Sequence, residues 1–112
     1  MKFALVYQYD PAQTSPTEAE IPEWMELDKQ LRESGELVYD CGFHAVDAAR
    51  TLSLRDGAEN LSDGVAATSG NVAAGFVVVD VPDVEAALTW ARKIPTARYG
   101  AVDVRPLVEW EG

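Results

Sequence analysis

The sequence predicts an α+β fold in which two helices cover one face of an antiparallel sheet. Three observations lead to this prediction. Strand-like segments lie near both ends of the chain, two segments carry apolar residues at helical spacing, and further strand-like segments lie between those two. The chain has 112 residues, of which 47% are hydrophobic and 25% charged. This composition is typical of one globular domain, which we expect to span residues 1–112.

The N-terminal part of the chain predicts a strand and then a helix. Residues 3–9 are rich in aromatic and branched residues, as strands are. One face of this strand carries Phe3, Leu5, Tyr7 and Tyr9. Residues 15–18 (Ser-Pro-Thr-Glu) have the form of a capping box, and Pro22 limits it to a short turn before a main helix over residues 22–34. Apolar residues recur along this helix: Ile21, Trp24, Met25, Leu27 and Leu31. Gly35 is a natural residue to end it.

A β-hairpin is predicted in the middle of the chain. Residues 50–55 alternate between polar and apolar side chains, so we expect Leu52 and Leu54 to point inward. Asp56-Gly57 is a turn dipeptide typical of hairpins. Residues 60–62 would then form the returning strand.

Two segments flank this hairpin. Residues 37–43 are a second strand candidate, weakened by Asp40 and Gly42. Residues 63–75 are nearly all small and offer little bulk for a core. We therefore expect this stretch to be the most mobile internal loop of the chain.

The C-terminal part predicts a strand, a helix and a last strand. Residues 76–81 are apolar at five of six positions. Pro82-Asp83 would cap a helix whose apolar stripe consists of Val84, Ala87, Leu88, Ala91 and Ile94. Pro95 would end this helix. Alternating side chains then predict a strand over residues 102–110, in which Pro106 favours an edge position or a bend.

The predicted order β-α-β-β-β-α-β is that of a ferredoxin-like sandwich when the strands are antiparallel and both helices lie on one face. Two helices leave the second face of the sheet uncovered. The segment 76–81 is apolar on both faces, which is typical of a strand that is covered on both. We therefore expect a second copy of the chain to cover the open face in a symmetric homodimer.

Charge and motifs exclude several classes of function. The net charge of −10 makes nucleic-acid binding unfavourable, because like charges repel. No apolar run is long enough to span a membrane, and the apolar N-terminal run is too short for a signal peptide, so we expect a cytoplasmic protein. Cys41 is the only cysteine and His44 the only histidine, so neither a disulfide nor a zinc site is expected. No phosphate- or dinucleotide-binding motif occurs, and we expect no cofactor.

The C-terminal half resembles a known family. The segments that carry the resemblance are 75–83, 86–91, 94–95 and 100–106. Together they resemble the YCII-related proteins of the DGPF-domain type, and the N-terminal half fits that family in layout. The resemblance implies a ferredoxin-like subunit that pairs into a dimeric α+β barrel. It also implies two kinds of role. Some such proteins look like accessory proteins of extracytoplasmic-function sigma factors, and a related branch resembles small lyases and dehalogenases acting on muconolactone-like compounds.

The chain departs from that family at its motif positions. The signature Asp-Gly-Pro-Phe reads Asp63-Gly64-Val65-Ala66 here, and the Thr-Lys-Glu that follows it reads Ser69-Gly70-Asn71. The related branch has a His/Asp pair as its proposed site, with the histidine in the first helix. Residues 22–34 contain no histidine, and His44 follows the second strand instead. His44 therefore does not inherit that role.

Three groups of residues could carry chemistry. His44 with Asp47 or Asp40 could form an acid–base pair, or His44 could be a loop residue on an acidic surface. Cys41 could be a nucleophile beside His44, or a small buried residue. Asp63 could take part in proton transfer, or could simply form a turn with Gly64.

A fourth group predicts a binding cleft. Its members are Tyr7, Tyr9, Arg98, Tyr99 and Arg105. Guanidinium groups bind carboxylates through paired hydrogen bonds, so these residues could hold a small anionic ligand. Alternatively, the tyrosines pack at the rim of the core and the arginines pair with nearby acids.

Two classes of function follow. We favour a homodimeric binding module without turnover, for a small molecule or a protein partner, with a possible regulatory role by resemblance to the sigma-factor-associated proteins. The alternative is a cofactor-independent lyase, isomerase or dehalogenase acting on a small anionic metabolite, with His44, Tyr7 or Asp63 as the proton-transfer group. The first class predicts that His44 does not line a closed cavity.

Overall fold

The fold is seen in a computed structural model, which describes residues 1–67 and 69–110. Its strands are β1 (Lys2–Tyr9), β2 (Leu37–Gly42), β3 (Arg50–Arg55), β4 (Ala58–Asp63), β5 (Val72–Asp80) and β6 (Ala101–Pro106). Its helices are α1 (Ile21–Ser34) and α2 (Val84–Ala91), with 3-10 turns η1 (Glu18–Glu20), η2 (Val46–Ala48) and η3 (Pro95–Arg98). Thr68 and residues 111–112 lie outside the described residues.

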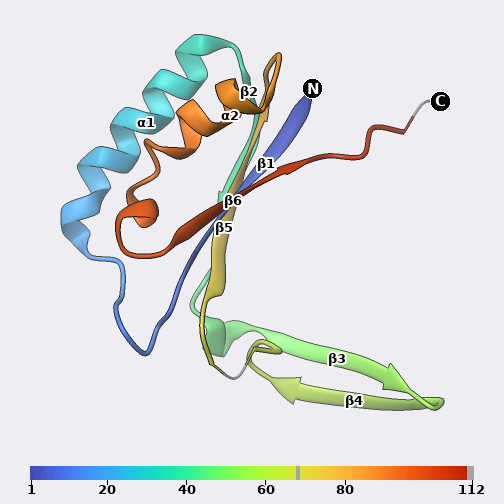
Figure 1. Ribbon diagram of the computed structural model, residues 1–112. Coiled ribbons are helices and arrows are strands. Elements are labelled where there is room, and N and C mark those ends of the chain that lie inside the picture. Colours follow the sequence, from blue (N-terminus) through green and yellow to red (C-terminus); the bar gives the residue numbers. More distant parts are fainter. Residues whose placement is uncertain (68, 111–112) are drawn as a thin grey trace.

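The predicted fold class is confirmed. Four strands form one antiparallel sheet in the order β2-β5-β1-β6, and α1 and α2 lie on the same side of it (Figure 1). This is the strand order of a ferredoxin-like sandwich, with the β3–β4 hairpin inserted between β2 and β5. In the described part of the chain, no helix is both long and apolar enough to cross a membrane.

Strand β1 organises the core. Phe3, Leu5 and Tyr7 are buried on the face toward the helices, as the alternation predicted. Their Cα partners on β5 are Val79, Val77 and Gly75 in that order. The helices add Leu27, Leu31, Ala87 and Ala91, and Ile94 follows α2. These side chains form one core between the sheet and the two helices.

The helix ends follow their predicted signals in most places. Gly35 ends α1 in the left-handed conformation with φ of 74°. The Asp83 side chain accepts a hydrogen bond from the Ala86 N–H at 2.9 Å and so caps α2. The predicted capping box over residues 15–18 is wrong, because helical backbone begins only at Glu18 and Thr17 makes no side-chain cap.

The predicted hairpin forms, with Asp56 and Gly57 both at positive φ in its turn. It is separate from the main sheet and extends well away from it (Figure 1). The prediction that Leu52 and Leu54 point inward is wrong, since they are 57% and 70% exposed. The physical reason is that no other element of the described chain covers this hairpin.

Asp63 ends strand β4 and strand β5 begins at Val72, so the predicted loop over residues 63–75 is wrong for its first residue and its last four, and its Thr68 lies outside the described residues. The small side chains there have a packing reason. Gly75 lies beneath the Tyr7 hydroxyl and the Cys41 carbonyl, which occupy the space a Cβ atom would need. Small size at this point therefore permits close packing, and does not mark a loop.

The last strand is shorter than predicted. β6 ends at Pro106, and Val108 and Trp110 are 74% and 90% exposed. The Leu107 N–H still donates to the Lys2 carbonyl at 2.8 Å, but β1 begins at Lys2, so the residues after Leu107 have run past the end of their partner strand. Val102 and Val104 do pack against the core, as the alternation predicted.

We expect Gly75→Ala to destabilise the fold by about 1–3 kcal/mol, because the added methyl overlaps the Tyr7 hydroxyl and the Cys41 carbonyl. Urea unfolding measures the change. Gly42→Ala is the matched control, because its Cβ would lie 3.6 Å from the Tyr7 hydroxyl, an ordinary contact. Equal stability of the two variants would contradict this packing.

Candidate functional site

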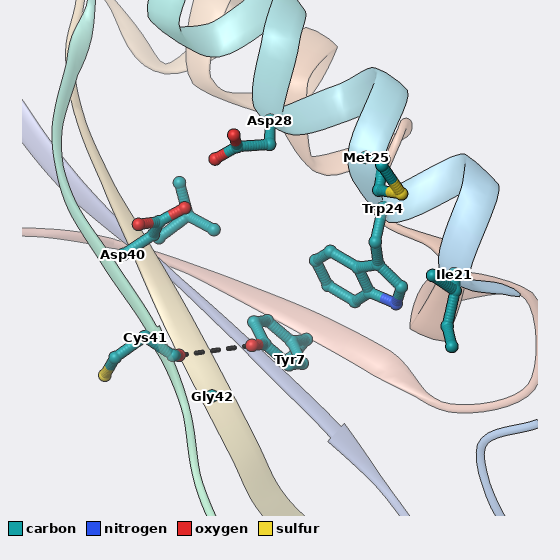
Figure 2. Close-up of a pocket in the computed structure, with 9 residues that line it drawn as sticks. Tyr7, Ile21, Trp24, Met25, Asp28, Asp40, Cys41 and Gly42 are labelled. Atoms are coloured by element: carbon teal, nitrogen blue, oxygen red, sulfur yellow. Dashed lines mark hydrogen bonds between the residues drawn. The ribbon is translucent and has the colours of Figure 1, made fainter. Parts of the chain in front are cut away.

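A cleft of about 590 Å³ lies between α1 and the β2 side of the sheet (Figure 2). Its lining residues are Tyr7, Ile21, Trp24, Met25, Asp28, Asp40, Cys41, Gly42 and Val77. The first two turns of α1 present apolar side chains toward edge strand β2, but these side chains do not fill the space between the helix and the strand. This unfilled space is the cleft. Ile21 and Met25, predicted as part of the apolar stripe, are 53% and 67% exposed and form its rim.

Tyr7 is the central side chain of this cleft. Its hydroxyl donates a hydrogen bond to the Cys41 carbonyl at 3.1 Å, and its ring lies 4.9 Å from that of Trp24 between centroids. Burial, followed by the charges of Cys41 and Asp40, raises the pKa of Tyr7 to about 12. At neutral pH the Tyr7 hydroxyl is therefore protonated and can act as a hydrogen-bond donor but not as a base.

Two carboxylates lie at the upper end of the cleft and share one guanidinium. Arg32 Nε lies 2.9 Å from Asp28 Oδ2, and Arg32 Nη2 lies 3.9 Å from Asp40 Oδ1. Arg32 itself does not line the cleft. The lining therefore combines aromatic and apolar surface with two acidic groups.

A second pocket of about 300 Å³ adjoins the first, since Tyr7 and Trp24 line both. The remaining lining residues come from the end of β1, the segment that leads into η1, η1 itself, the segment from the end of β2 to η2, the start of β5 and η3: Tyr9, Pro16, Glu20, Phe43, His44, Ala45, Val46, Val72, Ala73, Ala74 and Thr96. Glu20 and Thr96 are buried, at 8% and 3% exposure. Polar groups thus lie at the back of this pocket.

The structure separates the predicted acid–base group. His44 lines the second pocket together with Tyr7, but it is exposed and makes no hydrogen bond to a carboxylate within the described residues. Asp47 is exposed on η2, and Asp40 lines the other cleft. Asp63 lies on the hairpin, where it pairs with Arg50 at 3.2 Å. Cys41 contributes its carbonyl to Tyr7.

The five residues predicted to bind an anion are only partly brought together. Tyr7 and Tyr9 line the same pocket, and Tyr99 packs edge-on against Tyr9 at 6.4 Å between centroids. Arg98 instead forms two hydrogen bonds of 2.6 Å to the carboxylate of Glu23. Arg105 is paired with Ala4 on the sheet face opposite to Tyr7. Within the described residues neither guanidinium forms a hydrogen bond with the three tyrosines, although Arg98 lies near enough to Tyr99 to interact with its charge.

Sequence reasoning missed Trp24, Asp28 and Glu20 as site residues. The apolar stripe of α1 includes Trp24 and Met25 besides the buried Leu27 and Leu31. A stripe wider than the buried leucines need is a sequence signal for an apolar surface beside the core. Glu20 carries no sequence signal, because it is one acid among 19. Among the described residues, no group of three or more His, Cys, Asp or Glu side chains is arranged to hold a metal ion.

The raised pKa of Tyr7 predicts an alkaline loss of stability. An unfolded tyrosine titrates near pH 10, so the folded state holds its proton more tightly, and stability falls as pH rises from about 10 to 12. We expect Tyr7→Phe to lose about 1 kcal/mol at pH 7, the worth of its hydrogen bond. Between pH 10 and 12 the wild-type protein should lose about 2 kcal/mol of stability that Tyr7→Phe keeps, so the variant should become the more stable of the two. Urea unfolding from pH 7 to 12 checks this, and parallel pH profiles would contradict it.

Comparisons with known proteins agree with this architecture. The family model for the YCII-related domain matches residues 1–111. A comparison with curated proteins finds no match. Since the match covers nearly all of the chain, and the strand order is the one that the resemblance implied, the chain belongs to the YCII-related domain family.

Proposed function

We propose that this protein is a homodimeric module that binds a small molecule in the cleft beneath α1 and does not turn it over. The cleft itself carries this proposal. It presents the rings of Tyr7 and Trp24 beside the apolar side chains of Ile21, Met25 and Val77, with few polar groups among them. Ligand sites are usually concave, mostly apolar and supplied with a small number of placed polar groups.

Binding without turnover is favoured because the groups that could react are already engaged. Tyr7 stays protonated at neutral pH and donates to a backbone carbonyl. Asp28 and Asp40 share Arg32 at 2.9 and 3.9 Å. A proton-transfer site needs a group positioned to accept or give a proton near neutral pH. The larger cleft offers hydrogen-bonding groups of fixed orientation instead.

The homodimer is favoured by the face of the sheet opposite the helices. Val6, Phe76 and Val78 are only half-buried there, on adjacent positions of β1 and β5. Tyr39 and Phe43 are 58% and 53% exposed, and each ring lies 6.0 Å from that of Phe76 between centroids. A second copy placed face to face would bury this surface and give the dimeric α+β barrel that the resemblance implies.

The alternative, a cofactor-independent lyase, isomerase or dehalogenase, is favoured by one observation: His44 and Tyr7 line the same pocket. It is disfavoured by the exposure of His44 and by the pairing of Asp63 with Arg50 on the hairpin. A protein partner, as in sigma-factor accessory proteins, would be a regulatory form of the binding role. Both functions are proposed without a cofactor or metal ion, and a cytoplasmic location stays a prediction.

We expect neutral aromatic compounds to bind in the cleft through the two rings. Titration with 2-phenylethanol, followed by amide NMR shifts, should perturb Trp24, Cys41 and Gly42 most. Trp24→Ala should weaken binding about tenfold, since a lost aromatic contact is worth about 1 kcal/mol or more. Trp90→Ala is the matched control, because Trp90 lies on α2 outside both pockets. Shifts that spread over other surfaces would contradict the assignment.

We expect light scattering to give roughly twice the chain mass of 12.2 kDa at micromolar concentration. Val78→Lys should give a monomer, because it places a charge in the middle of the proposed apolar interface. Val84→Lys is the control, since Val84 is 46% exposed at the start of α2. A wild-type monomer, or a Val78→Lys dimer of undiminished stability, would contradict the interface.

A further inference from the structure

Glu20 is a buried carboxylate with an unusual environment. It ends the 3-10 turn η1, lines the second pocket, and is only 8% exposed. Buried acids are normally paired or hydrogen-bonded, because desolvating a charge is costly. Among the described residues, none of the ion pairs or side-chain hydrogen bonds engages the Glu20 carboxylate. It lines the pocket with the Tyr99 hydroxyl beside it, and no ion pair within the described residues holds it.

The groups around Glu20 interact with it, but within the described residues they form no ion pair with it. The nearby Arg98 guanidinium is held by Glu23 through two hydrogen bonds of 2.6 Å. The Tyr99 hydroxyl is buried and has no hydrogen-bond partner of good geometry. Burial, and next the hydrogen-bonding approach of the Tyr99 hydroxyl to the Glu20 carboxylate, raise the pKa of Tyr99, so the two groups lie close together. The charge of Glu20 is therefore open to a partner that enters through the pocket.

The two adjoining pockets share one electrostatic character. Their lining residues include Glu20, Asp28 and Asp40, and include no lysine or arginine. The net charge of −10 gives the whole molecule the same sign. Asp28 and Asp40 share Arg32, so Glu20 is the lining acid without an ion pair within the described residues. A carboxylate or phosphate ligand would be repelled by Glu20, whereas a cation would be attracted to it.

We propose that Glu20 binds the ammonium group of an amine ligand whose apolar body lies against Tyr7 and Trp24. The assignment rests on the proposed binding function and names its ligand class: primary or secondary amines with an aromatic or aliphatic body. A charge-assisted hydrogen bond to a buried carboxylate supplies the selectivity, and the faces of the Trp24 and Tyr7 rings favour an adjacent cation. An anionic ligand, expected from the sequence, does not fit this lining.

Three probes of one shape test the proposal: 2-phenylethylammonium, 2-phenylethanol and 3-phenylpropionate, each titrated at pH 7 by calorimetry or NMR. We expect the ammonium to bind about tenfold more tightly than the alcohol, and the carboxylate to bind most weakly. A carboxylate that binds as tightly as the ammonium overturns the ligand class but leaves the binding function standing. Binding of none of the three overturns both.

Two variants locate the effect. Glu20→Gln keeps the shape of the side chain and should remove the tenfold preference for the ammonium while leaving the affinity for the alcohol unchanged. Glu18→Gln is the matched control, because Glu18 is exposed on the same turn. An unchanged preference in Glu20→Gln overturns the role of Glu20. If that variant does not fold, the three-probe comparison on the wild-type protein still decides the ligand class.

Discussion

The contact of Tyr7 with Gly75 and Cys41 determines how the sheet and the cleft are built. β5 lies between β1 and β2, and the Tyr7 side chain crosses it to reach the Cys41 carbonyl at 3.1 Å. That path is open only because residue 75 has no side chain. This hydrogen bond links the inner strand β1 to the edge strand β2, and the Tyr7 ring also forms the wall that both pockets share. Core packing and site geometry therefore depend on one small residue opposite one large one.

Charge pairing explains why the arginines do not form the predicted anion site. The chain has 19 acids and 9 bases, and Arg32, Arg50 and Arg98 form ion pairs, whereas Arg105 lies on the other face of the sheet. Arg98 binds Glu23 and Arg32 binds Asp28, both by short contacts at the surface of the protein. Such exposed pairs add little stability, and neither arginine lines a pocket. Asp28 and Asp40 of the cleft share Arg32, which leaves Glu20 as the lining acid without an ion pair within the described residues.

The sequence predicts those features that local chemistry decides. Gly35 ends α1, Asp83 caps α2, and Asp56-Gly57 turns the hairpin, because each signal acts within a few residues. The alternation of β1 also predicts its buried face correctly. The start of β5 could not be predicted in the same way. By itself the small size of Gly75 favours a loop, and only the distant Tyr7 ring shows that this size is needed for packing.

The site was harder to predict than the fold for a related reason. A binding pocket is made by residues far apart in sequence, and Glu20, His44 and Thr96 meet only because η1, β2 and η3 end at the same side of the sheet. Type alone made His44 prominent, as the only histidine. Burial makes Glu20 prominent instead, and burial is a property of the fold. The rarity of a residue type, as for His44, therefore indicates the site less well than burial of a charged side chain, as for Glu20.

The two proposed surfaces of this protein lie on opposite faces of one strand. Along β5, Val77 faces α1 and the cleft, whereas Phe76 and Val78 face away from the helices. Strand alternation thus assigns ligand binding to one set of side chains and self-association to the other. A change on either face reaches the other mainly through the backbone of β5. Since packed strands shift little, we expect each protomer of a dimer to keep its own cleft, and occupation of one cleft to leave the other accessible.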